Sequence, residues 1–144
     1  MKIYLVGSLK DPDFPKVAQA LRDAGHDVFD DWRGGGCDGD KRWQYYEQEE
    51  RERNYVEALR SPFAESNFEF DKANLDKCDV AVAVCKAGKL PGRSSVAELA
   101  YVRWASGKHS YVLFNGEPDE WDLMLPLVVH DFFYTIDDLV EGLK

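Results

Sequence analysis

The clearest buried strand of the chain is Asp79-Val80-Ala81-Val82-Ala83-Val84-Cys85. Its apolar run is typical of a strand inside a parallel sheet. A turn of small and polar residues and then a helical pattern follow, in Pro91-Gly92-Arg93-Ser94-Ser95-Val96-Ala97-Glu98-Leu99-Ala100-Tyr101. In an open α/β sheet, ligands bind where loops leave the carboxyl ends of the strands. The turn before Glu98 is therefore expected at the ligand-binding edge.

Strands and helices alternate over the rest of the chain. The other expected strands are residues 2–6, 26–30, 109–114 and 131–134. The expected helices are one between Asp13 as its cap and Gly25 as its end, and then residues 41–59, 62–75, 95–106, 119–127 and 136–143. This alternation predicts a single α/β domain over residues 1–144, doubly wound around a five-stranded, mainly parallel sheet of flavodoxin-like order.

Length, composition and net charge exclude some classes of binding partner. The 144 residues suffice for one domain with a sizeable core, but not for two. A net charge of −9 argues against a nucleic-acid polymer as partner, although a small anion needs only a local cluster of donors. No apolar run is long enough for a membrane span, and residues 1–7 predict a strand rather than a signal peptide.

The cysteines and histidines predict no metal site. The cysteines are Cys37, Cys78 and Cys85, an odd number without metal-ligand spacing, which favours a reduced, cytoplasmic protein. The histidines are His26, His109 and His130, all near the starts of strands. They are therefore expected at the edge of the sheet opposite the ligand site, and no ligand constellation is evident.

Glu98 has two interpretations. Ser95-Val96-Ala97-Glu98 fits a capping box, in which Ser95 caps the helix and Glu98 reaches back to it. Alternatively, the helix N-terminus, with donors from Arg93, Ser94 and Ser95, binds an anionic group and places Glu98 beside the ligand as a nucleophile.

Three other features of the sequence also have two possible interpretations each. Asp71, next to Lys72, is either a solvated helix residue or the partner of Glu98 in the two-carboxylate arrangement of glycosidic chemistry. Asp30 and Trp32 end a strand at the expected edge, where Trp32 either stacks on a base or simply packs. The loop of residues 33–40, with Gly34, Gly35 and Gly36, favours a mobile surface loop over a phosphate cradle because no Walker-type lysine follows.

The segment after this loop is polar. Its acidic and basic residues alternate in sign, which indicates a solvated face. Tyr45, Tyr46 and Tyr55 within it either pack or line a cleft.

Four motifs, taken in order, resemble the nucleoside 2-deoxyribosyltransferase family and its relatives that hydrolyse the N-glycosidic bond of deoxynucleoside monophosphates. They are Lys2-Ile3-Tyr4-Leu5-Val6-Gly7-Ser8, Asp71 eight residues before Asp79, Glu98-Leu99-Ala100-Tyr101 with the later Gly107-Lys108, and Asp122-Leu123-Met124. The resemblance covers most of the chain.

The resemblance implies an enzyme, either transferase or hydrolase, that acts on a small nucleoside or nucleotide without a cofactor. Glu98 would attack C1′ of a deoxyribosyl group and form a glycosyl-enzyme ester, and Asp71 would position or protonate the base. The resemblance also implies a homo-oligomer, a dimer or larger, in which Asp122 reaches a neighbouring active site. The implied substrate-binding residues are Tyr4, Gly7, Ser8, Asp30, Trp32, Gly92, Arg93, Ser94, Ser95, Asp122 and Met124.

The chain departs from the transferases at two positions. Gly92 stands where they carry an aspartate, and Asp122 stands in place of an asparagine. The nucleotide hydrolases use serines near this turn to hold a 5′-phosphate, so Arg93-Ser94-Ser95 favours a nucleotide substrate. Two other functions remain open: a non-catalytic nucleotide-binding or signalling module on the same fold, and an N-ribosyl hydrolase acting on a dinucleotide such as NAD.

Overall fold

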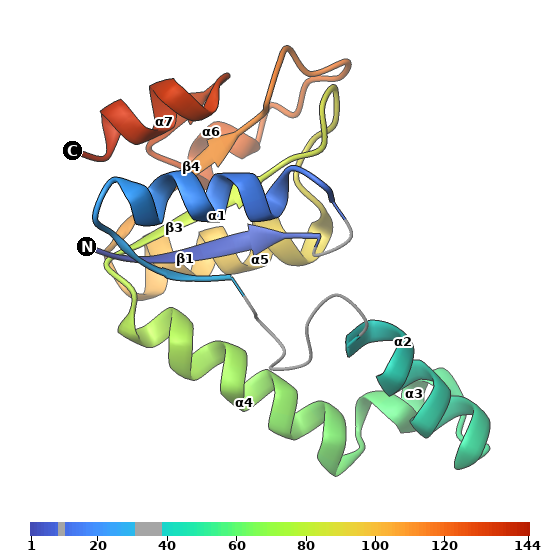
Figure 1. Ribbon diagram of the computed structural model, residues 1–144. Helices are drawn as coiled ribbons and strands as arrows, with labels where there is room; N and C mark the ends of the chain where they lie inside the picture. Colours follow the sequence, from blue (N-terminus) through green and yellow to red (C-terminus); the bar gives the residue numbers. More distant parts are fainter. Residues whose placement is uncertain (9–10, 31–38) are drawn as a thin grey trace.

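The computed structural model describes residues 1–8, 11–30 and 39–144 (Figure 1). Its one sheet has the order β2-β1-β3-β4-β5, and all neighbouring strands are parallel. The strands are β1 (Lys2–Gly7), β2 (Asp27–Phe29), β3 (Val80–Val84), β4 (His109–Leu113) and β5 (Asp131–Phe133). The predicted flavodoxin-like order is confirmed.

The register aligns the carboxyl ends of the strands. Gly7 of β1 pairs with Val84 of β3, which pairs in turn with Leu113 of β4. The chain segments that follow β1 and β3 therefore leave the sheet side by side. Ligand sites form at this position in open parallel sheets.

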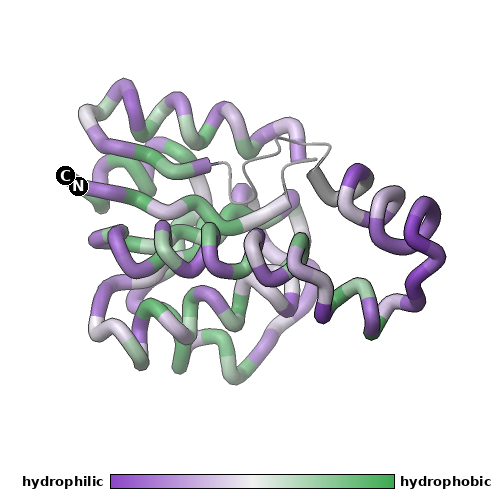
Figure 2. Tube along the Cα trace, turned by 90° about the horizontal axis from the view of Figure 1, so that it is seen from below, coloured by the Kyte–Doolittle hydropathy of each residue, from purple (hydrophilic) through white to green (hydrophobic). Residues whose placement is uncertain are grey.

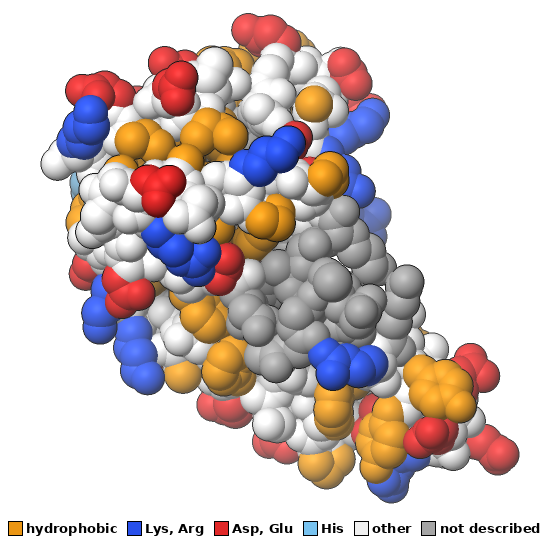
Figure 3. Space-filling view, in the orientation of Figure 1, with side chains coloured by type: hydrophobic (Ala, Val, Ile, Leu, Met, Phe, Trp, Pro, Cys, Tyr) orange, Lys and Arg blue, Asp and Glu red, His pale blue; other side chains and the backbone are white. Residues whose placement is uncertain are grey.

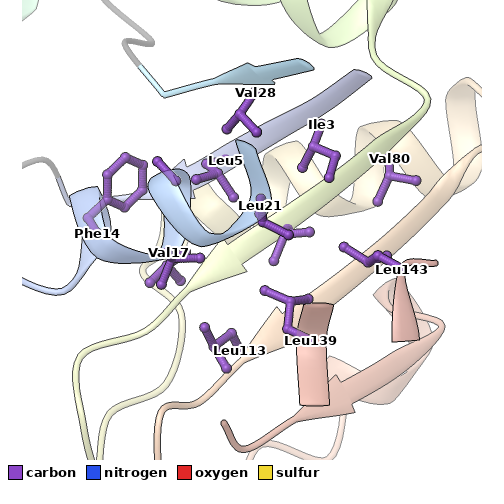
Figure 4. Packing of buried hydrophobic residues seen from close by; sticks show 13 residues of the cluster. Ile3, Leu5, Phe14, Val17, Leu21, Val28, Val80, Leu113, Leu139 and Leu143 are labelled. Carbon is purple, nitrogen blue, oxygen red and sulfur yellow. The ribbon is translucent and has the colours of Figure 1, made fainter. Parts of the chain in front are cut away.

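Each face of the sheet has its own apolar core, because alternate residues of a strand point to opposite faces. Ile3 and Leu5 face α1 (Phe14–Asp23) and α7 (Ile136–Gly142), where Leu21 and Leu139 are fully buried (Figure 4). Tyr4 and Val6 face the other core, which includes Leu75, Leu99 and Val102. This burial on both sides explains why the central strands read as continuous apolar runs.

The first helix begins and ends where the sequence predicts. Asp13 occupies the N-cap position, but its side chain makes no capping hydrogen bond. Its carboxylate instead accepts from Lys16 Nζ at 2.7 Å and from Asn115 Nδ2 at 3.0 Å. At the other end, Gly25 has φ +89°, the left-handed conformation that glycine adopts most readily.

The longest helix, α4 (Pro62–Lys77), confirms the helix predicted for residues 62–75 and extends it by two residues. Ser61 begins it, because its hydroxyl oxygen accepts a hydrogen bond from the Ala64 N–H at 3.2 Å. The amino-terminal end of α4 reaches beyond the sheet toward α3 (Tyr55–Leu59) (Figures 1 and 2).

The single helix predicted for residues 41–59 is wrong. The chain forms α2 (Gly39–Gln44), the π-helical η2 (Tyr45–Glu50) and, after a break, α3 (Tyr55–Leu59). At the break Glu52 has φ +54°, and Asn54 caps α3 by accepting from the Glu57 N–H at 3.0 Å. Buried Glu47 binds Arg53 across the break at 3.0 Å, a tertiary pairing that helical periodicity does not reveal.

These segments form a lobe, here residues 39–59, that stands out from the sheet (Figure 2). Hydrophobic side chains are exposed on its outer end (Figure 3). The exposed hydrophobic residues of the lobe as a whole include Tyr45, Tyr55 and Val56.

Two other helix predictions need correction. The helix predicted for residues 95–106 begins two residues earlier, as α5 (Arg93–Ala100), and continues as the π-helical η3 (Tyr101–Ala105). The helix predicted for residues 119–127 is only α6 (Leu125–Val128). Asp122 stops it from starting earlier, because its carboxylate accepts from the Met124 N–H at 2.8 Å in a local turn. Across the described ranges, no helix has both the length and the apolar character needed to cross a bilayer.

Candidate active site

A cleft of about 800 Å³ opens at the carboxyl edge of the sheet. Gly7 and Ser8 line it from the end of β1, and Val84 and Cys85 from the end of β3. One face of α4 forms a wall, because Ala64, Asn67, Phe68 and Asp71 recur at the spacing that aligns residues along a helix. The start of α5 forms the opposite wall.

Glu98 lines the cleft from α5, together with Ser94 and Ser95. The next residue, Leu99, is fully buried in the core, which fixes the rotation of the helix. The helix is capped at Gly92, without a side-chain hydrogen bond, so Ser95 is already the third helical residue. The capping-box interpretation is therefore wrong, since Ser95 is not the cap and Glu98 lies in the second turn rather than the first.

Asp71 lines the same cleft from the second half of α4. Its neighbour Lys72 is engaged elsewhere, because its ammonium group binds Asp76 at 2.7 Å. The structure thus brings Asp71 and Glu98 to one cleft, although they lie 27 positions apart (98 minus 71) in the sequence.

Tyr4 links the two carboxylates electrostatically. Its side chain is completely buried behind the cleft, and its hydroxyl has no hydrogen-bond partner in the described part of the chain. Burial raises the pKa of the Tyr4 phenol, and the nearby charges of Glu98 and Asp71 raise it further. The phenol therefore keeps its proton and is a potential donor between two acids.

Five predicted binding residues line the cleft: Gly7, Ser8, Gly92, Ser94 and Ser95. Gly7 is required by close packing, because a Cβ there would lie only 2.8 Å from the Val84 carbonyl oxygen. The start of α5, which has no side-chain cap, adds backbone N–H groups that suit an anion. Two of the three donors predicted for an anionic group, Ser94 and Ser95, thus line the cleft, and the anion site itself stays a prediction.

Among the described residues, the other predicted binding residues do not line the cleft. Arg93 is exposed outside it, while Arg22 holds Asp30 through two hydrogen bonds of 3.0 and 2.8 Å. Asp122 and Met124 are exposed on the segment before α6. Trp32, Cys37 and the glycine-rich segment Gly34–Gly36 lie outside the described residues.

Sequence reasoning missed several lining residues. Trp43, Leu59 and Phe68 form an apolar end with Tyr55, while Tyr46 instead packs near Phe63, with ring centroids 6.2 Å apart. The polar residues that were missed are Asp11, Asn67, Lys86 and Lys89. The helical spacing of Asn67 and Phe68 from Asp71 could have revealed those two, but nothing in the sequence marks Asp11 as buried.

The loop from Lys86 to Leu90 is held in place by a distant segment. The Asp119 N–H donates to the Gly88 carbonyl oxygen at 2.9 Å. Gly88 has φ +73°, and a Cβ there would lie 2.8 Å from the Asp119 carboxylate. Only glycine therefore fits this approach, which sets the position of both lysines at the cleft.

The histidines lie at the opposite edge, as predicted. His109 begins β4 and stacks on His130, with ring centroids 4.4 Å apart. Within the described ranges, no group of three or more histidine, cysteine or acidic side chains could hold a metal ion. Cys78 and Cys85 are buried thiols, and burial followed by the charge of Asp11 raises the pKa of Cys85 to about 12.

The fold and the cleft together define a flavodoxin-like α/β protein with paired carboxylates at the carboxyl edge of its sheet. No protein-family model matches the chain, and a search of curated proteins finds no significant match. Solved structures do match.

One similar structure is a 2-deoxyribosyltransferase from Bacillus psychrosaccharolyticus, with a TM-score of 0.65 and 19% identity, covering 97% of this chain and 90% of that one. Another is the CMP N-glycosidase BcmB from Clostridium botulinum, with a TM-score of 0.57 and 15% identity, covering 99% of this chain and 97% of that one. The resemblance stated from the sequence is thus confirmed at the level of the fold.

Proposed function

We propose that this protein cleaves or transfers at the N-glycosidic bond of a 2′-deoxynucleoside or its 5′-monophosphate. The observation that carries the proposal is the shared cleft of Glu98 and Asp71, whose charges both act on the buried phenol of Tyr4. A deoxyribosyl group reacts through an oxocarbenium-like transition state, which a nearby carboxylate stabilises. The two structural neighbours carry out chemistry of this kind on their own substrates.

The proposed reaction has two steps. A Glu98 carboxylate oxygen bonds to C1′ while the C1′–N bond breaks, and its electron pair leaves with the base. Asp71 positions the base and helps to deliver the proton that the departing nitrogen takes up. In the second step, the oxygen of water or the nitrogen of a second base attacks C1′, loses a proton and releases the Glu98 carboxylate.

The two ends of the cleft suit the two ends of such a substrate. Trp43, Tyr55 and Phe68 offer aromatic faces on which a base stacks. Ser94, Ser95 and the uncapped start of α5 offer donors to a 5′-phosphate. In this proposal the sugar connects these two ends and meets the carboxylates of Glu98 and Asp71.

We also propose that the protein is a homo-oligomer in which a second copy covers the segment before α6. Large apolar side chains are exposed there, with Trp121 at 77% and Leu123 at 90% of full exposure. An exposed apolar patch of this kind marks an interaction site. In such an assembly, Asp122 and Met124 would approach a neighbouring cleft.

Glu98→Gln tests the catalytic proposal. The purified variant and the unchanged protein are incubated with deoxynucleosides, their 5′-monophosphates and NAD, with and without an acceptor base, and released base is measured by chromatography. We expect base release by the unchanged protein and a loss of at least about a thousandfold in Glu98→Gln, because the amide is not a nucleophile.

The matched control is Glu69→Gln, an exposed glutamate of α4 that does not line the cleft. It should keep full activity. Free base identifies a hydrolase and exchanged base a transferase. Full activity in Glu98→Gln, or binding without any base release by the unchanged protein, would contradict the proposal.

A further inference from the structure

Asp11 is a buried carboxylate that the proposed reaction does not use. Its side chain is only 4% exposed, yet it lines the same cleft as Glu98 and Asp71. The backbone holds it in place between β1 and α1, because the Asp11 N–H donates to the Ser8 carbonyl at 2.9 Å and the Phe14 N–H donates to the Asp11 carbonyl at 3.2 Å.

The two carboxylate oxygens of Asp11 have different surroundings. Oδ1 accepts a hydrogen bond from the Asp13 N–H at 3.0 Å. Oδ2 is buried and receives no hydrogen bond from the described residues. A buried carboxylate oxygen without a donor is costly, and nearly all buried polar groups in folded proteins are paired. The missing donor is therefore expected among the contents of the cleft.

The chemistry of the cleft narrows the identity of this donor. A carboxylate only accepts hydrogen bonds, so a phosphate, which is also an anionic acceptor, is repelled. The base is expected at the apolar end formed by Trp43, Tyr55 and Phe68. A sugar hydroxyl is the remaining part of a deoxynucleoside that carries a neutral donor.

We propose that Asp11 Oδ2 accepts a hydrogen bond from a hydroxyl group of the substrate's deoxyribosyl ring. The inference rests on the proposed function and adds a substrate-binding residue to it. With Asp11 holding one hydroxyl, the ring is oriented before Glu98 attacks. The phosphate, when present, then lies away from Asp11, toward the start of α5.

The test measures binding by isothermal titration calorimetry in proteins that also carry Glu98→Gln, so that the compound stays intact. The probes are the four common 2′-deoxynucleosides and their analogues that lack the 3′- or the 5′-hydroxyl. We expect Asp11→Asn to weaken binding of the parent compounds by roughly tenfold or more, because a hydrogen bond to a charged acceptor is lost.

The analogues turn this measurement into a double-mutant cycle. Removing the hydroxyl that Asp11 binds should weaken binding to Asp11-containing protein by a similar factor, and should cost almost nothing further in Asp11→Asn. Removing the other hydroxyl should have the same effect in both proteins.

Asp13→Asn is the matched control, because Asp13 belongs to the same loop but pairs with Lys16 and does not line the cleft. It should bind like the unchanged protein. The unfolding temperature of each variant is recorded, and Asp11→Ser, which keeps an acceptor for the Asp13 N–H, replaces Asp11→Asn if the latter unfolds.

Unchanged binding in the Asp11 variant, or additive losses for both hydroxyl groups, would overturn this inference alone. Failure of the Asp11-containing protein to bind any of the deoxynucleosides would overturn this inference. The proposed function is overturned only if the base-release assay also detects neither free nor exchanged base from the deoxynucleosides and their 5′-monophosphates.

Discussion

Tyr4 shows how a single buried residue connects stability with activity. Its ring stacks on Phe29, with centroids 5.0 Å apart, while its hydroxyl is buried without a hydrogen-bond partner in the described part of the chain. Leaving a buried hydroxyl unpaired costs free energy. The charges of Glu98 and Asp71 both act on this hydroxyl. We therefore expect the hydroxyl to serve as a hydrogen-bond donor during the proposed reaction, which explains why an unpaired group is kept there.

We expect Tyr4→Phe to lower kcat for base release by roughly tenfold or more, because the only donor lost is the one beside the two carboxylates. The unfolding temperature should stay the same or rise, since the ring stacking is retained. Steady-state kinetics and thermal unfolding monitored by circular dichroism measure the two effects.

Tyr111→Phe is the corresponding control, because that hydroxyl pairs with His109 at the opposite edge of the sheet. It should leave kcat unchanged. A Tyr4→Phe variant with full kcat would contradict the role proposed for the phenol.

At the scale of secondary-structure elements, α5 carries both the proposed nucleophile and the candidate anion site. Its cap is Gly92, which has no side chain to occupy the first N–H groups. Ser94 and Ser95 in the first turn line the cleft, and Glu98 follows on the same wall. About one helical turn thus separates the serines that would bind a phosphate from Glu98, which would react.

A substitution in the first turn of α5 should therefore weaken binding of the phosphorylated substrate alone. We expect Ser95→Ala to raise KM for the 5′-monophosphate by roughly tenfold or more, the value of one hydrogen bond to a charged group, and to leave KM for the free nucleoside unchanged. Steady-state kinetics on both substrates measure the difference.

Arg93→Ala provides the comparison, because Arg93 is exposed outside the cleft. The sequence-based hypothesis predicts that Arg93→Ala also raises KM selectively for the 5′-monophosphate. The exposed position of the Arg93 side chain instead predicts a smaller rise in KM than in Ser95→Ala. Equal losses on both substrates in either variant would argue against a phosphate site at this helix end.

The amino-terminal edge of the sheet should govern the pH dependence of stability. Burial lowers the pKa of His26 and of His130 below the ordinary value of 6.5, and His109 lowers that of His130 further. The folded state therefore disfavours their protonation relative to the unfolded state. Their contribution to stability is present above about pH 6.5 and is lost as the pH falls through their folded-state pKa values.

We expect the urea midpoint of unfolding to fall between pH 7 and pH 5, above the range in which most carboxylates titrate. The variant His130→Gln should show a flatter dependence, because it removes one of the two groups. A midpoint that is constant over this range would contradict the prediction.

At the scale of the whole molecule, the segment before α6 and the lobe both expose large apolar side chains to solvent. Leu123 is 90% exposed. We expect Leu123→Asp to convert the proposed oligomer into smaller species, because a charge in an apolar interface must be desolvated on association. Light scattering coupled to size-exclusion chromatography measures the change in mass.

Lys108→Asp, a charge change directly before β4 at the amino-terminal edge of the sheet, serves as a comparison, although it removes a bond to the Asp76 carbonyl. It should leave the mass unchanged. A monomer in the unchanged protein would contradict the oligomer proposal.

The fold was predictable because its determinants are local. Each local pattern indicates the backbone conformation of its own residues. Examples are the apolar run Val80–Val84 for a strand, Gly25 for a helix end, and Ser61 before Pro62 for a helix start. Parallel connections then leave few topologies for five strands separated by helices. That Glu98 and Asp71 line one cleft agrees with the order and spacing of the motifs, while their roles stay a prediction.

Other parts of the site depend on contacts between distant segments, which local patterns do not encode. The break in the segment of residues 41–59 depends on the buried pairing of Glu47 with Arg53. Helix α5 begins two residues earlier than predicted, because Gly92 serves as its cap. Asp11 reads as an ordinary loop aspartate, and only its burial beside Cys85 makes it a candidate ligand-binding group.

The amino-acid sequence alone therefore defines the α/β class, the strand order and the two acidic residues, because periodicity and turn chemistry act over a few residues at a time. Only the tertiary structure shows that Glu98 is no helix cap, that Tyr4 lies near both acids and that Asp11 shares their cleft. These relations arise when strands that are far apart in the chain align their carboxyl ends, and burial and electrostatic coupling exist only after that alignment.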